Sequence, residues 1–148
     1  MKASVDLLVN SVISRQTGSS YSFEYLFKNS ELREIIGFSV NLKVEARVAN
    51  REMLIALKAN SMRLADKRDI TALCNGEVDV EKVVSHLRRC PEQIIIQNID
   101  GFLETLEDER YKDSIKGVFR LSDRAYERVT ERAKKVFLEV REELVHPP

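Results

Sequence analysis

Cysteine and glycine are scarce in this sequence, and long hydrophobic runs are absent. The 148 residues include two cysteines, Cys74 and Cys90, and five glycines. With so few cysteines and no basic-then-hydrophobic leader, we expect reduced thiols in the cytoplasm rather than a disulfide framework. The longest apolar runs, such as residues 94–96, fall far short of the ~20 residues that cross a bilayer. We therefore expect a cytoplasmic protein that does not enter the membrane.

The sequence also lacks an excess of charge of either sign. Its 24 basic and 24 acidic residues cancel, so no global field attracts nucleic acid or an anionic membrane. Contact with nucleic acid would depend on a local patch, and the net charge gives it no support. A length of 148 residues and a hydrophobic content of 43% are those of one domain with a substantial core.

The common catalytic and cofactor motifs are missing as well. The sequence has no Ser/His/Asp signature, no His-Glu-x-x-His, no Cys-x-x-Cys and no glycine-rich dinucleotide fingerprint. The polar run of residues 15–20 contains Gly18 but lacks the repeated glycines and the Lys-Ser/Thr ending of a phosphate loop. His86 and His146 have no second ligand at metal-binding spacing. These absences leave residues 49–74 as the segment that says most about function.

Hydrophobic alternation predicts strands in the first third of the chain. Residues 3–13 are rich in aliphatic and β-branched residues and predict a strand that carries Asp6. Residues 38–44 alternate between apolar and polar, as expected for a half-buried strand, and residues 34–36 suggest its hairpin partner. Ser22 is placed to cap a short helix, and Asn50 is placed to cap the helix that follows the hairpin.

The rest of the sequence has a helical pattern. Asp79 is placed to cap a helix, and apolar residues recur at helical spacing through residues 80–87 and 95–106. A short helix is predicted to end at Gly117. We predict an α+β fold, in which a small, mostly antiparallel sheet of about three strands from the N-terminal third packs against a C-terminal bundle of about five helices. Residues 1–75 would form the α+β region and residues 76–148 the helical region, packed as one domain.

The last helix is predicted to begin after Ser122 and to carry a narrow apolar stripe. The stripe consists of Tyr126, Val129, Ala133, Val136 or Phe137, Val140 and Leu144. A narrow stripe fits either packing on the protein's own helices or a helix-to-helix dimer. We favour packing within the chain because the stripe is short, and the sequence leaves both alternatives open.

Residues 49–74 combine a helix with a lysine in an apolar setting. One side of this helix carries, at helical spacing, Met53, Leu54, Leu57 and Lys58. The ammonium of Lys58 therefore either reaches solvent along an apolar surface or is held toward a cleft that contains negative charge. Asp66 and Asp69 have the spacing of an N-cap and a third helical residue in the next helix. Lys67 and Arg68 would then lie in its first turn, either solvated or directed at an anion.

The same segment resembles the motif of a known enzyme superfamily. It reads Leu-Ile-Ala-Leu-Lys58, followed by Arg63, Asp66 and Asp69-Ile70. This order resembles the Leu-x-x-x-Lys … Arg-x-x-(Lys)-Asp-x-x-Asp-(Ile/Leu) signature of nucleotidyltransferases of the DNA polymerase beta-like superfamily, in particular the minimal group that includes the AbiEii toxins. Val5-Asp6-Leu7-Leu8 resembles the strand that supplies a carboxylate in that family. The resemblance covers residues 3–75.

The resemblance implies roles for individual residues. Asp6 would be the third carboxylate on the central sheet, and Lys58 would reach the nucleotide phosphates or the reacting hydroxyl. The full set comprises the catalytic candidates Asp6 and Lys58, the nucleotide-binding candidates Lys58, Arg63, Lys67 and Arg68, and the site-ordering residues Asp66 and Asp69. One position departs from the signature, because Ala65 stands where a lysine is usual.

A larger departure concerns the metal site. The family holds two divalent metals with an Asp-x-Asp pair after a Gly-Ser turn, whereas no Asp-x-Asp follows Gly18-Ser19, and Glu24 stands alone. In-line nucleotidyl transfer needs two cations bridged by several carboxylates, and Asp6 alone cannot hold them. No complete metal site is expected, and magnesium with a nucleoside triphosphate is expected only if a partner completes the site.

Three interpretations follow from these patterns. In the first, the chain is an incomplete nucleotidyltransferase-like protein, inactive alone, which binds a nucleotide or serves as a partner-completed subunit. In the second, it is a non-enzymatic interaction module that forms a homo-oligomer or binds a protein partner through its N-terminal sheet edge or its C-terminal helix. In the third, Lys58 is only a structural lysine. Whether the chain is an enzyme stays undecided.

Overall fold

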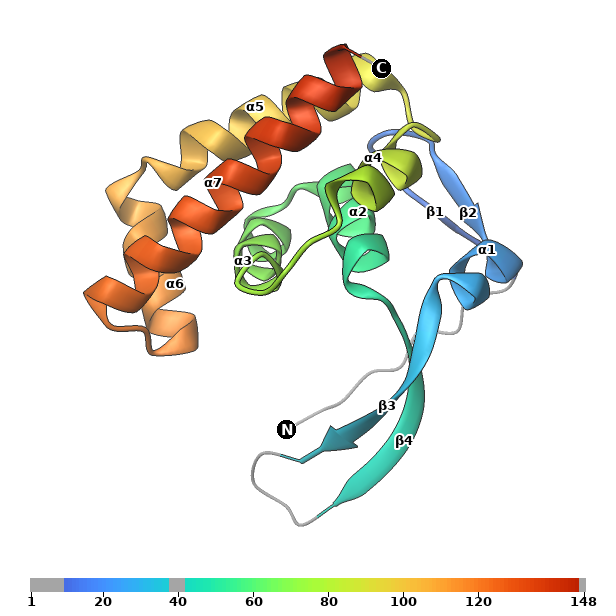
Figure 1. Cartoon of the computed structure of the whole chain (residues 1–148), viewed down its shortest axis with the longest axis horizontal. Coiled ribbons are helices and arrows are strands. Elements are labelled where there is room, and N and C mark those ends of the chain that lie inside the picture. Colours follow the sequence, from blue (N-terminus) through green and yellow to red (C-terminus); the bar gives the residue numbers. More distant parts are fainter. Residues whose placement is uncertain (1–9, 38–41, 147–148) are drawn as a thin grey trace.

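The computed structural model describes residues 10–37 and 42–146, and a β-hairpin projects from its helical body (Figure 1). The elements are, in chain order, β1 (Ser11–Ile13), β2 (Ser20–Ser22), α1 (Phe23–Lys28), β3 (Ser30–Ile36), β4 (Lys43–Ala49), α2 (Arg51–Ser61), α3 (Leu64–Leu73), α4 (Val80–Leu87), α5 (Glu92–Leu106), α6 (Glu109–Phe119) and α7 (Asp123–Val145). The α+β class is confirmed. The described residues form seven helices and four strands, where about five and about three were predicted.

The four strands form two separate antiparallel pairs rather than the single sheet that was predicted. β1 pairs with β2, and β3 pairs with β4. Helix α1 connects the two pairs, and Ser22 caps it as predicted by accepting a hydrogen bond from the Tyr25 N–H. Because the chain turns through this helix, β2 and β3 do not continue one ladder. Of the strand predicted over residues 3–13, the structure shows Ser11–Ile13, and Asp6 lies outside the described residues.

The structure has a β-hairpin in this region, but its second strand lies further along the chain than predicted and the hairpin is more exposed. Each of its strands has seven residues. The strand predicted over residues 38–44 lies partly outside the described residues, and the strand that the structure shows is Lys43–Ala49. The prediction of half-burial is wrong for Leu42 and Val44, which are both exposed. The reason is that the hairpin extends away from the helices (Figure 1).

Helix α2 turns a different face to the core from the one predicted. Asn50 caps the helix as predicted, and its side chain accepts the Met53 N–H at 2.9 Å. The buried residues of this helix are Met53, Ile55, Ala56, Ala59 and Asn60, whereas Leu54, Leu57 and Lys58 are half-buried. α2 packs against α3, α4 and α5. The small side chains of Ala56 and Ala59 allow these helices to approach closely, so they occupy the core face in place of the leucines.

Helices α5 and α7 follow their predicted stripes. The buried residues are Ile95, Ile99, Phe102 and Leu106 in α5, and Tyr126, Val129, Ala133, Phe137, Val140 and Leu144 in α7. The rings of Phe102 and Phe137 meet edge to face with their centroids 4.7 Å apart, a favourable aromatic geometry. α7 also packs against α3, α4 and α6. Its stripe is therefore buried within the chain, as the favoured alternative predicts.

The predicted start of α4 is correct, whereas the predicted end of α6 is not. Asp79 caps α4 as predicted, and its carboxylate accepts the Lys82 N–H. α6 runs past Gly117, so the predicted end at that glycine is wrong. The helix ends instead where Arg120 adopts a left-handed backbone with φ of 52°, and the Arg120 N–H donates to the carbonyl of Lys116. Arg120 thus supplies the conformation that a C-terminal glycine usually supplies.

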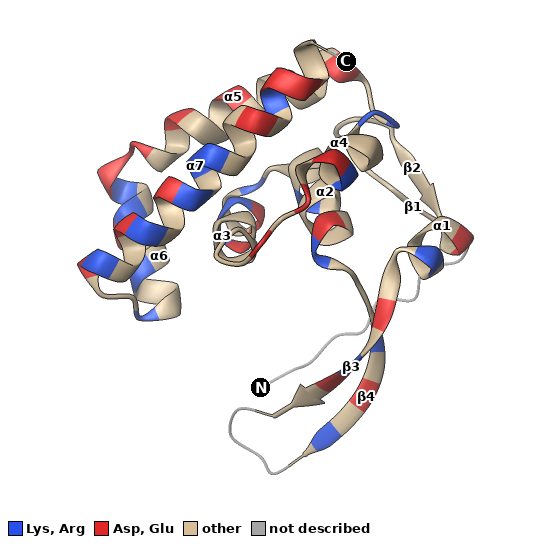
Figure 2. Cartoon of the chain, viewed as in Figure 1, with Lys and Arg blue, Asp and Glu red and all other residues tan. Residues whose placement is uncertain are grey.

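One hydrophobic core spans both sides of residue 75. It includes Tyr21 and Ile70 before this residue and Val83, Phe102 and Phe137 after it. Acidic and basic residues alternate along α7 and over the neighbouring helices (Figure 2). In the part of the chain that the structure describes, no helix is long and apolar enough to span a bilayer.

Candidate functional site

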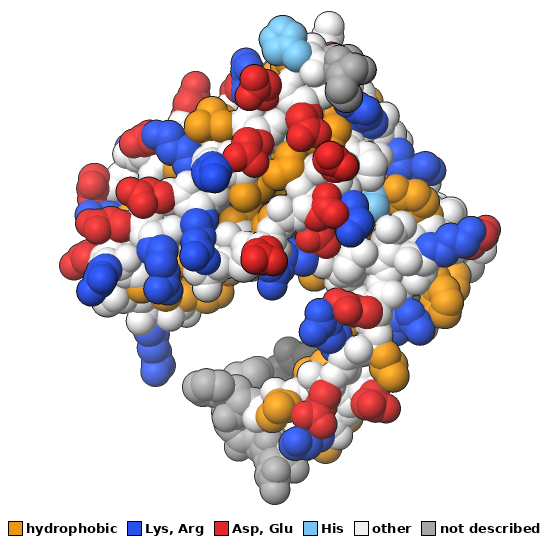
Figure 3. Space-filling view, viewed as in Figure 1, with side chains coloured by type: hydrophobic (Ala, Val, Ile, Leu, Met, Phe, Trp, Pro, Cys, Tyr) orange, Lys and Arg blue, Asp and Glu red, His pale blue; other side chains and the backbone are white. Residues whose placement is uncertain are grey.

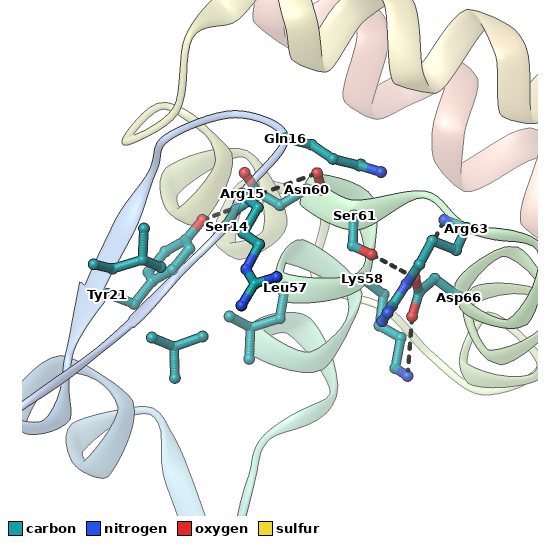
Figure 4. Close-up of a pocket in the computed structure, with 12 residues that line it drawn as sticks. Ser14, Arg15, Gln16, Tyr21, Leu57, Lys58, Asn60, Ser61, Arg63 and Asp66 are labelled. Atoms are coloured by element: carbon teal, nitrogen blue, oxygen red, sulfur yellow. Dashed lines mark hydrogen bonds and ion pairs between the residues drawn. The ribbon is translucent and has the colours of Figure 1, made fainter. Parts of the chain in front are cut away.

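A pocket of about 530 Å³ lies beside the C-terminal half of α2 (Figure 4). Its walls come from β1, β2 and the loop between them, from α2, and from the N-cap and first turn of α3. The lining residues are Val12, Ile13, Ser14, Arg15, Gln16, Tyr21, Leu57, Lys58, Asn60, Ser61, Arg63 and Asp66. The volume falls within the ~300–1,000 Å³ that is usual for small-molecule sites. The pocket brings Lys58, Arg63 and Asp66 of the predicted motif onto one surface.

The charged side chains of the pocket are mostly basic. Among the described residues, Arg15, Lys58 and Arg63 line it together with one acidic residue, Asp66. Arg15 extends from the loop toward Leu57 (Figure 4). Arg15 was not predicted as a site residue, although it begins the polar run that was compared with a phosphate loop. An excess of positive charge beside apolar side chains suits a ligand that carries both an anionic group and an apolar body.

Asp66 is the most fully bonded residue of the pocket. Its Oδ2 accepts hydrogen bonds from the Ser61 hydroxyl at 2.6 Å, the Arg63 Nε at 2.9 Å and the Arg63 N–H at 3.2 Å. The side chain is only 4% exposed. Burial by itself would raise the pKa of Asp66, but the hydrogen bonds from Arg63 and Ser61 outweigh burial and lower the pKa below its ordinary value. Asp66 is therefore a charged, structural carboxylate that orders the corner between α2 and α3.

Lys58 is held by two carboxylates at the edge of the pocket. Its Nζ lies 2.5 Å from the Asp69 Oδ2 and 3.4 Å from the Asp66 Oδ1. Burial lowers the pKa of Lys58, but its bonds to Asp69 and Asp66 outweigh burial and raise the pKa above its ordinary value. The ammonium is thus charged and fixed in position. Since it has three N–H donors, one donor is left for a ligand in the pocket.

The start of α3 differs from the prediction. Arg63 is the N-cap and Leu64 the first helical residue, so Asp66 is the third helical residue rather than the cap. The Asp66 carboxylate accepts the N–H of Arg63, which is half of a capping box. Asp69 lies one turn further on and pairs with Lys58, so it does not face the helix N-terminus. The shift arises because the αα-corner is only two residues long, between Ser61 and Leu64.

The structure does not bring Lys67 and Arg68 to this pocket. The Lys67 Nζ donates to the Gly101 carbonyl at 3.1 Å and to the Thr105 hydroxyl at 2.6 Å. Arg68 donates to the Ser114 hydroxyl at 3.0 Å. Both side chains therefore connect α3 to α5 and α6, and neither of the two roles considered from the sequence, solvation or anion binding, describes them. Burial lowers the pKa of Lys67.

The described residues do not fit a two-metal centre. No group of three or more His, Cys, Asp or Glu side chains within residues 10–37 and 42–146 is placed to hold a metal ion. Asp66 and Asp69 are close to one another, but Lys58 binds both of them. An ammonium between two carboxylates occupies the place that a cation would need. We therefore derive no metal-dependent step from these residues.

No protein-family model, no curated protein and no solved structure matches the chain. Its function must therefore be inferred from the pocket and the surfaces of the molecule.

A buried polar network beneath the pocket connects β1–β2 to α2 and α4. The Asn60 side chain accepts from the Thr17 hydroxyl at 2.8 Å and donates to the Tyr21 hydroxyl at 3.1 Å. Tyr21 in turn donates to the His86 carbonyl at 3.1 Å. Asn60 was not predicted as a functional residue, because a single asparagine near the end of a helix carries no motif in the sequence. The network fixes the wall of the pocket that β1 and its loop provide.

His86 ends this network with one unsatisfied nitrogen. Its Nδ1 lies 2.7 Å from the Tyr25 hydroxyl, and its buried Nε2 has no hydrogen-bond partner among the described residues. His86 is a buried residue of α4, and the described residues place no metal-binding group around it. Burial lowers the pKa of His86; Arg89 and Lys82 add to this effect, and Glu52 opposes it.

The free energy of unfolding is therefore expected to fall as the pH drops from about 7 to about 5. The unfolded chain binds a proton at the ordinary histidine pKa of about 6.5, whereas folded His86 stays neutral to a lower pH. As the pH falls below about 6.5 toward the lower pKa of folded His86, the unfolded chain binds more protons than the folded chain, so protonation favours the unfolded state. Urea denaturation at several pH values measures the slope. His86→Asn should make the free energy of unfolding less dependent on pH between about 7 and 5. An unchanged pH dependence in that variant would show that His86 is not its cause.

Proposed function

We propose that the chain is a nucleotide-binding, nucleotidyltransferase-like protein that is inactive alone and acts with a partner. The observation that supports this proposal is the pocket in which Lys58 and Arg63 of the motif lie together with Arg15. A nucleotide has the two parts that this pocket suits, an anionic phosphate chain and a less polar base and sugar. The resemblance of residues 54–70 to the superfamily motif points to the same ligand class.

The phosphate group would be bound by the basic side chains. Arg15 forms no hydrogen bond or ion pair within the described residues, and Arg63 uses its Nε for Asp66 while its two terminal NH₂ groups stay available. Guanidinium groups bind phosphate oxygens with good geometry. Lys58 would add its remaining N–H donor. Asp69 and Asp66 hold the ammonium in place, so the lysine does not need to be ordered by the ligand.

The base and sugar would lie against the apolar side of the pocket. This side is formed by Val12 and Ile13 of β1 and by Leu57 of α2. The hydroxyls of Ser14 and Ser61 lie on the same surface and could bond the ribose. The walls of the pocket thus offer both kinds of contact that a nucleotide needs.

Transfer of the nucleotide would require a partner. Because the described residues do not form a metal centre, the carboxylates that hold magnesium in this superfamily would have to come from that partner, with a nucleoside triphosphate as the shared substrate. We place the protein in the cytoplasm, since Cys74 and Cys90 are both free thiols. No step of the reaction is assigned to this chain beyond binding and orienting the nucleotide.

Calorimetric titration with each of the four ribonucleoside triphosphates, in EDTA, tests the binding. Arg15→Ala and Lys58→Ala should each weaken binding by about tenfold or more, the usual effect of losing one hydrogen bond to a charged group. Lys135→Ala is the matched control, because Lys135 is an exposed lysine on α7 outside the pocket. Equal affinity in the wild type and both pocket variants would exclude this site.

Labelled nucleotide incubated with magnesium and candidate acceptors tests the claim of inactivity. The isolated chain is expected to transfer no label to tRNA or protein. Clear metal-dependent transfer by the chain alone would contradict the need for a partner, while leaving the binding site itself intact.

A further inference from the structure

The outer edge of β4 has no partner strand among the described residues. Within residues 10–37 and 42–146, β4 pairs only with β3. The Gly37 N–H donates to the Leu42 carbonyl at 2.9 Å, and the Asn50 N–H donates to the Asn29 carbonyl at 2.8 Å. Since bonded pairs alternate along an antiparallel ladder, these two bonds determine which residues point their N–H and C=O groups away from β3. The outward set is Lys43, Glu45, Arg47 and Ala49. Such an edge can pair with another strand.

Glu45 lies beside a like charge on this hairpin. The register places it opposite Glu34 of β3, and like charges at opposite positions are destabilising. Glu34 is compensated by Lys43, whose Nζ lies 3.1 Å from its carboxylate. Glu45 itself forms no ion pair among the described residues. A cation brought to the outer edge of β4 would therefore meet an uncompensated carboxylate.

The sequence of β4 is complementary to itself when it is read in the antiparallel direction. Its central residues are Val44, Glu45, Ala46, Arg47 and Val48. We propose that a second copy of this chain pairs with β4 in antiparallel orientation, with a twofold axis at Ala46. Glu45 of each copy then faces Arg47 of the other, the two valines face one another, and Ala46 faces itself. This is the isologous arrangement of a symmetric dimer, and it is independent of the nucleotide site.

Other registers are unfavourable. A shift of two residues toward the hairpin tip places Glu45 opposite Glu45, and a shift of two the other way places Arg47 opposite Arg47. After a shift of one residue, residues whose N–H and C=O groups point away from β3 lie opposite residues whose groups are already bonded to β3. The hydrogen bonds between the two copies then cannot form. A shift of four residues toward the tip would set Lys43 opposite Glu45, but it pairs only residues 43–45 of β4 and uses a lysine that Glu34 already binds. The pairing centred on Ala46 is the register that satisfies both the backbone bonds and the charges over the whole strand.

Arg47 has contacts within its own chain and still keeps N–H donors for a second copy. Its guanidinium lies 4.3 Å from the centre of the Phe27 ring, and one of its terminal nitrogens donates to the Ser30 carbonyl at 3.1 Å. A guanidinium has five N–H donors, so donors remain for the carboxylate of Glu45 in the other copy. The stacking on Phe27 also holds the side chain in place before pairing.

Dimerisation would also support the hairpin itself. Ile35 and Val44 are opposite one another on one face of the hairpin and are 45% and 46% exposed. Figure 3 shows hydrophobic side chains on the surface of this arm, apart from the helical body. A two-stranded ribbon alone is only marginally stable in water. Pairing through β4 makes a four-stranded sheet and brings the apolar strips of the two copies side by side.

Sedimentation over a range of concentrations tests the dimer with a charge exchange. Glu45→Arg and Arg47→Glu each place like charges opposite one another in the dimer, so each should weaken self-association by about tenfold or more. The double variant E45R/R47E restores opposite charges and should dimerise again, and an equimolar mixture of the two single variants should form a heterodimer. A wild-type chain that stays monomeric, or single variants that dimerise as it does, would overturn the proposal.

Disulfide trapping tests the register separately. In the proposed pairing Ala46 faces its own copy as a non-hydrogen-bonded pair, for which the Cα atoms are about 4.5 Å apart, within the range that a disulfide bridges. Ala46→Cys should therefore form a covalent dimer under mild oxidation, while Lys43→Cys, which faces Ala49 of the other copy, should not. Cys74 and Cys90 are buried and do not interfere. Equal cross-linking of the two variants would exclude this register.

Discussion

Asp66→Ala is expected to lower the free energy of unfolding by about 2–3 kcal/mol. The substitution removes the acceptor of the Ser61 hydroxyl and of two Arg63 donors, and it takes one carboxylate from Lys58. Removing one member of a fully buried ion pair costs about 3–5 kcal/mol. The expected loss is smaller here because Arg63 and part of Lys58 reach solvent and can be hydrated again.

Asp69→Ala is the matched control for this variant. Both aspartates bind Lys58, but the Asp69 side chain is 44% exposed, whereas that of Asp66 is 4% exposed. The Asp69 pair should therefore contribute no more than about 1 kcal/mol. Urea denaturation at pH 7 measures the free energy of unfolding of the Asp66→Ala and Asp69→Ala variants. Equal losses would mean that the pairs with Lys58, and not the capping of α3 by Asp66, stabilise the corner.

The contribution of Asp66 also has a pH dependence of known sign. Because its pKa in the folded chain is lower than in the unfolded chain, the stabilisation is present above the unfolded pKa and is lost as the pH falls through the folded pKa. The loss therefore occurs below about pH 4, well separated from the change expected for His86. Asp66→Ala should remove the acidic part of the profile and leave the His86 part unchanged.

Phe137→Ala is expected to have a still larger effect, a loss of about 3–5 kcal/mol in the free energy of unfolding. Phe137 is fully buried in α7, and its ring packs edge to face on Phe102 of α5. The substitution removes this aromatic contact and leaves a cavity between two helices whose other side chains cannot close it. Many domains have a total stability of only ~5–15 kcal/mol, so this variant should be close to unfolding.

Leu138→Ala provides the control for the loss of side-chain volume on the same helix. Leu138 is the next residue of α7, but its side chain is 48% exposed and lies outside the core. Its substitution should cost about 0.5 kcal/mol or less. Thermal denaturation of the two variants tests the orientation of α7, since losses of similar size would mean that the helix is rotated from the position described.

The helical half of the fold was predictable from the sequence because its signals are local. Ile95, Ile99, Phe102 and Leu106 recur at helical spacing, and the structure buries all four. In α2 the same reasoning failed. Ala56 and Ala59 carry little apolar surface and give a weak signal, yet close helix packing places them in the core. Which face of α2 is buried depends on α4 and α5, which are distant in sequence.

Strand pairing was harder to predict for the same reason. Alternation identified the hairpin, but it does not say whether a strand joins a larger sheet or projects into solvent. Val44 alternates as a half-buried residue would, and the structure leaves it exposed. The division into two strand pairs follows from the position of α1, the short helix that Ser22 was predicted to cap.

The part of the candidate site that lies on the adjacent helices α2 and α3 could be predicted, because it depends only on the spacing of residues along the sequence. Lys58 and Asp66 do meet, because eight residues that include a short corner bring them together. Arg15 and Asn60 were missed because the first reaches the pocket from a loop 43 residues before Lys58 and the second acts through Tyr21. The directions of Lys67 and Arg68 could not be predicted, since the sequence alone does not show which side of α3 faces α5 and α6.

The anchoring of Tyr21 has a consequence for the order of folding. Its hydroxyl bonds to Asn60, His86 and Cys90, which are 39, 65 and 69 residues away. Contacts over such separations are slow to form because the intervening chain must first be brought together. We therefore expect the β1–β2 pair, with strands of three residues, to become ordered after α2 and α4 dock. The wall of the pocket that this pair provides is then expected to open more readily than the helical core, and slower amide exchange in α5 and α7 than in β1 would test this.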